Sequence, residues 1–304
     1  MKTNVTFNSA GFSIVGNLYV PVGLASGRHP AIVVSHPAGG VKEQTAGLYA
    51  RLLAAQGFIT LAFDAAYNGE SSGEPRGLED PAQRIEDIKS AITFMGLRDD
   101  VDPDRIGVLG ICASGGYVIP AAATDHRIKA VATVSGVDLG SFFRVGFDGK
   151  QDPAVLQAML DFAAKARTAE ASGEAPQAFP VFPPNEEEAR KLGQYVYEGW
   201  EYYCTDRAQH PGSTKLMPWI SVDRIAAFDG FRFIDLIAPR PLLMIVGTKA
   251  DTRWMAEAAF PRAQEPKELF WIDGASHVDL YDKLDYVTPA VARLGDFYRQ
   301  KLGV

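Results

Sequence analysis

The sequence predicts an α/β fold with a mostly parallel, twisted sheet and helices on both of its faces. Residues 31–34 form a short, wholly apolar run, which is typical of a strand buried on both faces of a sheet, and residues 58–63 and 105–110 are expected to be further buried strands. Between them, residues 43–56 and 81–97 carry apolar side chains at helical spacing. Strands that alternate with amphipathic helices indicate a parallel sheet with crossover helices.

The two ends of the chain complete this pattern. Residues 1–20 alternate apolar and polar side chains, with a break at residues 8–11, and this pattern predicts an antiparallel hairpin. The later strands and the last helix are expected at residues 129–135, 242–247, 268–272 and 280–302.

One long segment interrupts the alternation. About a hundred residues separate the strand that ends near residue 135 from the strand that starts at 242, whereas an ordinary strand–helix loop has about 2–6. We therefore expect a discontinuous core domain, residues 1–136 and 237–304, and a mainly helical cap or lid insert, residues 137–236. Within the insert, helices are expected at residues 153–169 and 186–206, the second capped by Asn185.

Composition excludes several classes of function. The net charge is −7, which disfavours nucleic-acid binding. Two cysteines are too few for a disulfide framework or a Cys-rich zinc site, so we expect no metal. The sequence shows neither a secretory signal nor an apolar run approaching the ~18 residues of a membrane span. We expect a cytoplasmic protein without a membrane partner, and the sequence leaves a homodimer open.

The segment from residue 105 to 116 carries a candidate nucleophile, Cys112, between a buried strand and the start of a helix. A sharp strand-to-helix turn needs small residues two positions either side of the nucleophile, and Gly110 and Ser114 stand there. The helix dipole should lower the thiol pKa, and the Ala113 amide should face an oxyanion. Taken alone, this pattern is equally typical of a small buried cysteine.

Further chemistry-bearing residues follow other strands. Asp251 comes after the strand at 242–247, and His277 comes after the strand at 268–272. Nucleophile, acid and histidine in this order are expected in an α/β-hydrolase, with Asp138 as the alternative acid. After the first parallel strand, a glycine-rich loop could turn a second amide towards the oxyanion, at Ala38 or its neighbour Pro37.

Four motifs carry a resemblance to a known family: residues 36–44, Asp64 with residues 69–71, residues 110–117 and residues 274–277. They resemble the α/β-hydrolase superfamily, and most closely its dienelactone-hydrolase-like branch, which carries cysteine at the nucleophile position. The resemblance implies an α/β-hydrolase fold, a Cys112–His277–Asp251 triad, and hydrolysis of an ester, thioester or lactone without a cofactor. The sequence departs from that branch in its long insert and in lacking a Glu near the oxyanion loop, so the dienelactone substrate itself is not implied.

The partner expected at this site is a small acyl substrate. Ser114 is the rival nucleophile, and His36 is expected to make structural hydrogen bonds beside the site. Insert aromatics could line an acyl or aryl pocket or form a small satellite core. The residues expected to contact substrate are His36, Ser114, Phe142, Phe143 and Trp200. Two alternatives stay open: an acyltransferase with the same triad, and a catalytically silent fold that binds a small ligand.

Overall fold

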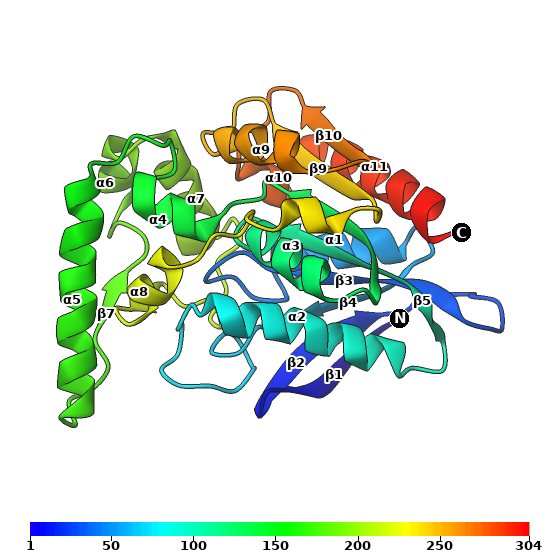
Figure 1. The fold of residues 1–304 in the computed structure, drawn as a ribbon, viewed down its shortest axis with the longest axis horizontal. Helices are drawn as coiled ribbons and strands as arrows, with labels where there is room; N and C mark the ends of the chain where they lie inside the picture. Colours follow the sequence, from blue (N-terminus) through cyan, green and yellow to red (C-terminus); the bar gives the residue numbers. More distant parts are fainter. Residues whose placement is uncertain (304) are drawn as a thin grey trace.

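The computed structural model describes residues 1–303 and contains a central eight-stranded sheet (Figure 1). The strand order is β1-β2-β4-β3-β5-β6-β9-β10, and every neighbouring pair from β4 to β10 is parallel. The predicted fold class is therefore confirmed. The strands are β1 (Lys2–Ser9), β2 (Phe12–Tyr19), β3 (His29–Ser35), β4 (Ile59–Phe63), β5 (Val101–Ile111), β6 (Ile128–Val134), β9 (Leu242–Gly247) and β10 (Lys267–Ile272).

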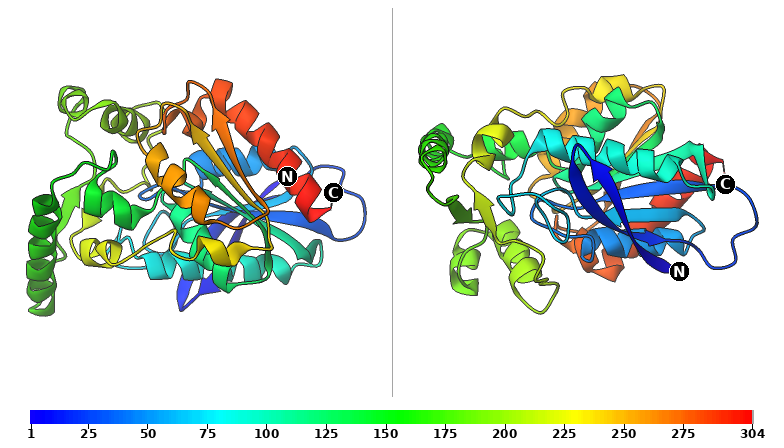
Figure 2. Two further views of the ribbon diagram at one scale, coloured as in Figure 1. Left: turned by 45° about the horizontal axis from the view of Figure 1, so that its top comes forward. Right: turned by 90° about the horizontal axis from the view of Figure 1, so that it is seen from below.

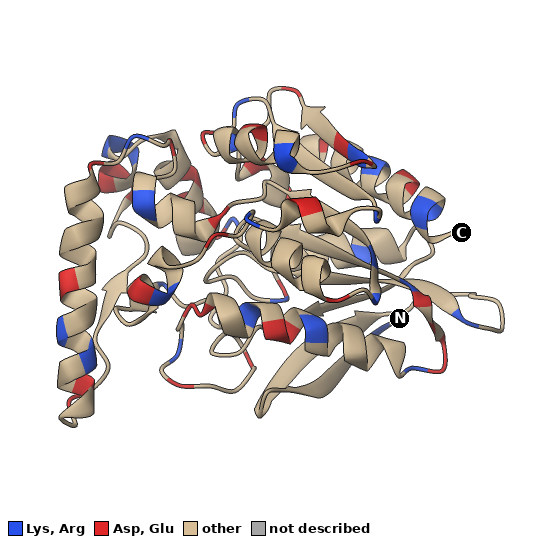
Figure 3. Cartoon of the chain, in the orientation of Figure 1, with Lys and Arg blue, Asp and Glu red and all other residues tan. Residues whose placement is uncertain are grey.

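Helices cover both faces of the sheet. Helix α1 packs against α11 on one face, and α2 packs against α3 on the other (Figure 2). The core helices are α1 (Thr45–Ala54), α2 (Pro81–Gly96), α3 (Ser114–Thr124), α9 (Arg253–Ala259), α10 (Asp279–Asp282) and α11 (Leu284–Leu302), with 3-10 turns η1 (Ile234–Ile237) and η2 (Phe260–Arg262). Charged residues lie mainly on these helices and on loops (Figure 3), while β3, β4 and β9 carry no Lys, Arg, Asp or Glu, and the charged residues of β5 lie in its first half. Apolar burial between the layers therefore holds the sheet in place.

The N-terminal hairpin is confirmed as predicted. Strands β1 and β2 pair antiparallel over their full length, with Ser9 opposite Phe12. Ala10 and Gly11 form the two-residue turn with φ angles of 48° and 93°. Two positive φ angles are what a type I′ turn requires, and its twist suits a hairpin.

The long segment between β6 and β9 lies largely to one side of the sheet (Figure 1). It contains α4 (Leu139–Val145), α5 (Pro153–Ala171), α6 (Glu186–Lys191), α7 (Gln194–Cys204), α8 (Ser221–Ala226) and a two-stranded sheet of β7 (Ala178–Pro180) and β8 (Leu216–Pro218). The single helix expected at residues 186–206 is wrong, because Gly193 adopts a φ of 104° and separates α6 from α7. The Asn185 cap is confirmed by its side chain, which accepts a hydrogen bond from the Glu188 N–H.

The insert also shares the main hydrophobic core. Tyr202, Met217 and Phe231 are buried in the same apolar cluster as the sheet. The division into a core domain and a cap domain stays a prediction.

The topology marks one place on the sheet for a ligand. The chain runs from β3 outward to β4 and then returns to β5 on the other side of β3, so the order reverses between β3 and β5. Ligands in open α/β sheets bind beyond the carboxyl ends of the strands at such a switch point. Ser35 and Gly110 are paired at the ends of these strands, which brings the loops after β3 and β5 side by side. No helix within residues 1–303 is both long and apolar enough to cross a membrane.

Candidate active site

Cys112 occupies a strained turn between β5 and α3. Its φ is 55°, a left-handed conformation that residues other than glycine seldom adopt. The turn is tight, because a Cβ placed on Gly110 would lie 2.2 Å from the Ser114 carbonyl oxygen. Strain of this kind persists where surrounding structure enforces it, and it gathers at functional sites. The turn presents the Cys112 side chain to a cavity above the sheet.

Burial sets the charge state of this thiol. Cys112 is 9% exposed, and burial raises its pKa to about 11, although the Tyr281 hydroxyl and the Ala113 amide lower it in part. The sequence-based expectation that the helix start lowers this pKa is therefore wrong in net effect, because desolvation outweighs the nearby dipoles. The resting thiol is neutral at pH 7.

His277 lies in the loop that follows β10 and is 1% exposed. Burial lowers its pKa to about 3, so the imidazole is neutral at pH 7. Its Nδ1 lies 2.7 Å from the Thr252 hydroxyl, and its Nε2 lies 3.1 Å from the Tyr281 hydroxyl. The Tyr195 ring meets the imidazole edge-on, with centroids 5.2 Å apart. The ring is thus fixed from three sides.

The orienting partner of His277 differs from the sequence prediction. Asp251 is exposed, and no hydrogen bond joins it to His277 within residues 1–303. The next residue, Thr252, is 2% exposed and meets Nδ1 instead. Strands β9 and β10 pair so that Gly247 faces Ile272, which brings the two following loops together.

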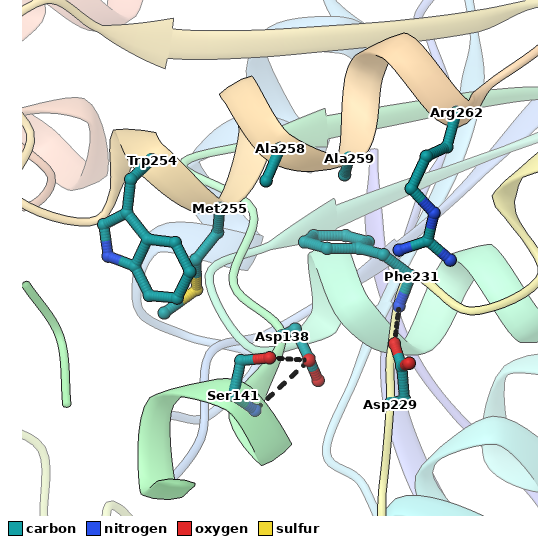
Figure 4. A pocket seen from close by; sticks show the side chains of 9 residues that line it. All are labelled: Asp138, Ser141, Asp229, Phe231, Trp254, Met255, Ala258, Ala259 and Arg262. Carbon is teal, nitrogen blue, oxygen red and sulfur yellow. Dashed lines mark hydrogen bonds between the residues drawn. The ribbon is translucent and has the colours of Figure 1, made fainter. Parts of the chain in front are cut away.

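The alternative acid, Asp138, has a different role in the structure. Its side chain caps α4 by accepting hydrogen bonds from the Gly140 and Ser141 amides at 3.1 and 3.2 Å. It also accepts from the Gly230 amide at 2.8 Å. With Ser141 and Arg262, Asp138 borders a small hollow of about 110 Å³ beside α9 (Figure 4). Asp138 therefore ties the insert to the core and is not a partner of His277.

The oxyanion loop follows β3. Pro37 and Ala38 line the same cavity as Cys112. Pro37 is wrong as an oxyanion donor, since proline has no N–H, and its carbonyl accepts from the Gly40 amide. The Ala38 amide has no hydrogen-bond partner among the described residues and is free to bind an oxygen atom, whereas the Ala113 amide lies next to the Cys112 thiol and lowers its pKa in part.

A buried ion pair holds this loop. The Lys42 ammonium is 1% exposed and lies 2.8 Å from the Asp64 carboxylate. Asp64 also accepts from the Lys42 and Glu70 backbone amides at 2.7 and 2.9 Å. These bonds anchor the segment just beyond Ala38 to the end of β4.

Three residues expected to contact substrate do not line the cavity. His36 is fully buried, with Nδ1 2.7 Å from the Pro37 carbonyl and Nε2 accepting from the Ala65 amide, so its role is structural. The Ser114 hydroxyl is also fully buried, 2.8 Å from Ser35 Oγ and 2.8 Å from Arg84, and Ser114 does not line the cavity. Trp200 lies outside the lining and stacks on Tyr197.

The cavity has a volume of about 800 Å³ and is mainly apolar. Phe142 and Phe143 line it, as the sequence suggested for both. No Lys, Arg or His side chain lines it among the described residues, and its single charged side chain is that of Glu188. Other lining residues are Leu139, Phe147, Met159, Phe179, Phe182, Leu192, Tyr195, Tyr203, Met217 and Tyr281.

Sequence reasoning missed Thr252 and Tyr281, whereas Tyr195 is one of the insert aromatics expected at an acyl or aryl pocket, and it lines the cavity. Tyr281 follows His277 by four residues, a spacing that brings two side chains together where the chain turns helically. That spacing was the available signal. No group of three or more His, Cys, Asp or Glu side chains in the described part of the chain could hold a metal ion.

Replacing Thr252 with valine is expected to lower kcat for ester cleavage about 10-fold, because His277 loses the partner that fixes its ring. Asp251→Asn is the matched change at the neighbouring position, and we expect it to alter kcat by less than about 2-fold, since no hydrogen bond links Asp251 to His277. Steady-state kinetics on the two variants tests this directly. A larger loss in Asp251→Asn than in Thr252→Val would restore the Cys–His–Asp arrangement.

Comparison with known proteins identifies the family of the chain. Residues 32–288 match the Alpha/beta hydrolase family. The chain is 38% identical to uncharacterized protein YcjY of Escherichia coli strain K12, over 99% of this chain and all of that protein. The crystal structure of hypothetical protein PA2218 of Pseudomonas aeruginosa superposes with a TM-score of 0.91 and 35% identity, covering 99% and 94% of the two chains. Acyltransferase drtE of Aspergillus calidoustus is 25% identical, over 97% of this chain and 96% of that protein. The chain therefore belongs to the alpha/beta hydrolase family.

Proposed function

We propose that the protein cleaves neutral carboxylic esters, thioesters or lactones through an acyl-enzyme on Cys112. The observation that carries the proposal is the strained Cys112 on the wall of a large apolar cavity, beside the unpaired Ala38 amide and the Ala113 amide at the start of α3. This arrangement suits nucleophilic attack on a carbonyl, as in the Cys-nucleophile, dienelactone-hydrolase-like branch that the sequence resembles.

The reaction uses the residues in defined roles. His277 accepts the proton that Cys112 loses as Sγ attacks the carbonyl carbon. The Ala38 and Ala113 amides bind the oxyanion, and the leaving group departs with a proton from His277. Water, activated by His277, then releases the acid and regenerates the thiol.

The cavity favours a neutral, mainly hydrocarbon acyl or aryl group. Its volume of about 800 Å³ is in the range of pockets that bind drug-sized ligands. A carboxylate on the acyl group would find no cationic partner in the lining, and Glu188 would repel it.

A series of p-nitrophenyl esters of increasing acyl length tests this proposal. We expect kcat/KM to rise up to about 4-fold for each methylene until the cavity is filled, the limit set by ~0.8 kcal/mol per buried CH₂. A p-nitrophenyl ester of a dicarboxylic acid of equal length is the control, and it should react much more slowly. Equal rates for the two acyl groups would contradict the proposed specificity, and absence of turnover and of acyl-enzyme with every ester, thioester and lactone would favour a silent ligand-binding fold.

An acyltransferase is the second candidate, supported by the full-length match to the acyltransferase drtE. Cys112 would form the same acyl-enzyme, and an alcohol or thiol would replace water in the second step. Product analysis with added alcohol separates the two: transesterified product that exceeds free acid at millimolar alcohol indicates a transferase.

A further inference from the structure

The resting structure leaves a gap in the path of the Cys112 proton. No hydrogen bond joins the Cys112 thiol directly to His277 among residues 1–303. The Tyr281 hydroxyl lies 3.1 Å from His277 Nε2, the nitrogen that must accept the proton. Tyr281 lines the same cavity as Cys112, and its hydroxyl lowers the pKa of the Cys112 thiol in part. Tyr281 therefore contacts the base and lines the cavity that the nucleophile faces.

Surrounding rings fix the Tyr281 side chain in this position. It is 3% exposed and sits on the short helix α10, four residues after His277. The rings of Tyr202 and Tyr203 meet it edge-on, with centroids 5.1 and 6.5 Å away. These ring contacts hold the Tyr281 hydroxyl beside His277.

We propose that Tyr281 is a catalytic residue that relays the proton from Cys112 Sγ to His277 Nε2 during acylation. This inference rests on the proposed function. As Sγ attacks the carbonyl carbon, the thiol proton moves to the Tyr281 oxygen, and the original phenolic proton moves to Nε2. The carbonyl π electrons move to the oxyanion, and Tyr281 ends the step as a neutral phenol. Reversal of the two transfers returns a proton to the leaving group as its bond to carbon breaks.

The environment suits a relay rather than an ionised tyrosine. Burial raises the Tyr281 pKa well above its usual value, and the nearby Cys112 raises it further, so the phenolate is disfavoured. Because the Tyr281 hydroxyl takes up one proton while it releases another, it can relay a proton without ionising. The His277 tautomer is compatible, since Nδ1–H can donate to Thr252 and leave Nε2 as acceptor.

The test is a double-mutant cycle on the acylation step. Pre-steady-state release of p-nitrophenol is measured for wild type, Tyr281→Phe, His277→Gln and the double variant. We expect each single variant to acylate at least about 10²-fold more slowly than wild type. If Tyr281 and His277 transfer the same proton one after the other, removing both costs no more than removing one, so the double variant should acylate no more slowly than His277→Gln. Tyr202→Phe is the matched control, because it removes a buried hydroxyl that packs beside Tyr281 but outside the cavity.

A second readout separates a relay from a packing role. In mixtures of light and heavy water, two protons in flight give a curved dependence of the wild-type acylation rate on deuterium fraction. Acylation of Tyr281→Phe at the wild-type rate, losses that multiply in the double variant, or a linear dependence in wild type would each overturn the relay while leaving the acyl-enzyme mechanism in place. Failure of wild type to acylate with any ester would overturn the proposed function and the relay together.

Discussion

Replacing Cys112 with alanine is expected to lower kcat/KM for acyl esters by at least about 10⁴-fold, because the variant has no atom that can form the acyl-enzyme. The fold should survive, since alanine is smaller than cysteine and the left-handed turn is already imposed by its surroundings. Intact-mass analysis after rapid quenching should show the acyl adduct in wild type and none in Cys112→Ala.

Two variants serve as controls for Cys112→Ala: one removes the other thiol of the chain, and the other removes the hydroxyl of the rival nucleophile. Cys204→Ala removes the other free thiol, which is half-buried on α7, and should retain full activity. Ser114→Ala removes a buried hydroxyl that bonds Ser35 and Arg84, so it should lower the free energy of unfolding by about 1 kcal/mol and leave acylation intact. Retention of the acyl adduct in Cys112→Ala, with its loss in Ser114→Ala, would show that the nucleophile is Ser114.

Gly110→Ala is expected to lower the free energy of unfolding by about 3 kcal/mol and to abolish most activity. The added Cβ would lie 2.2 Å from the Ser114 carbonyl oxygen and 2.8 Å from the Gly115 nitrogen. Both atoms belong to the backbone of the turn, so relief requires the turn itself to move and to displace Cys112. Urea unfolding followed by circular dichroism measures the free energy of unfolding. Ester turnover by the folded protein reports whether Cys112 has been displaced.

Gly96→Ala is the matched control for this substitution. A Cβ on Gly96, the last residue of α2, would have its nearest neighbours at 3.8 Å, which is ordinary contact. We expect no loss of activity and a gain in stability of up to about 1 kcal/mol, because alanine loses less backbone entropy in a helix. Equal effects of the two substitutions would mean that the turn at Cys112 is looser than the structure indicates.

The sequence was sufficient for the features that depend on local pattern. Buried strands and amphipathic helices located the sheet, and the small residues at Gly110 and Ser114 located the turn at Cys112. Strand order along the chain then placed His277 near the same sheet edge. Each of these steps needed only the short-range periodicity of apolar residues, or the rule that the carboxyl ends of parallel strands lie at the same edge of the sheet.

Other features depend on packing that a single sequence does not encode locally. Thr252 rather than Asp251 meets His277 because, in the turn before α9, the Thr252 side chain is buried and the Asp251 side chain is exposed. The Cys112 pKa rises because the cavity walls desolvate the thiol, and those walls include residues more than a hundred positions away along the insert. His36 and Ser114 are occupied by structural hydrogen bonds from distant segments, which removes both from the cavity surface.

The protonated resting state of Cys112 has a consequence for oxidative stress. Peroxides attack thiolates, and a thiol whose pKa is raised to about 11 supplies very little thiolate at neutral pH. A cysteine activated by a permanent charge would be open to sulfenic acid formation whenever the site is empty. In the proposed mechanism the Cys112 thiol loses its proton only as it attacks an acyl group, so we expect wild-type protein to keep its ester activity after exposure to peroxide when no substrate is bound.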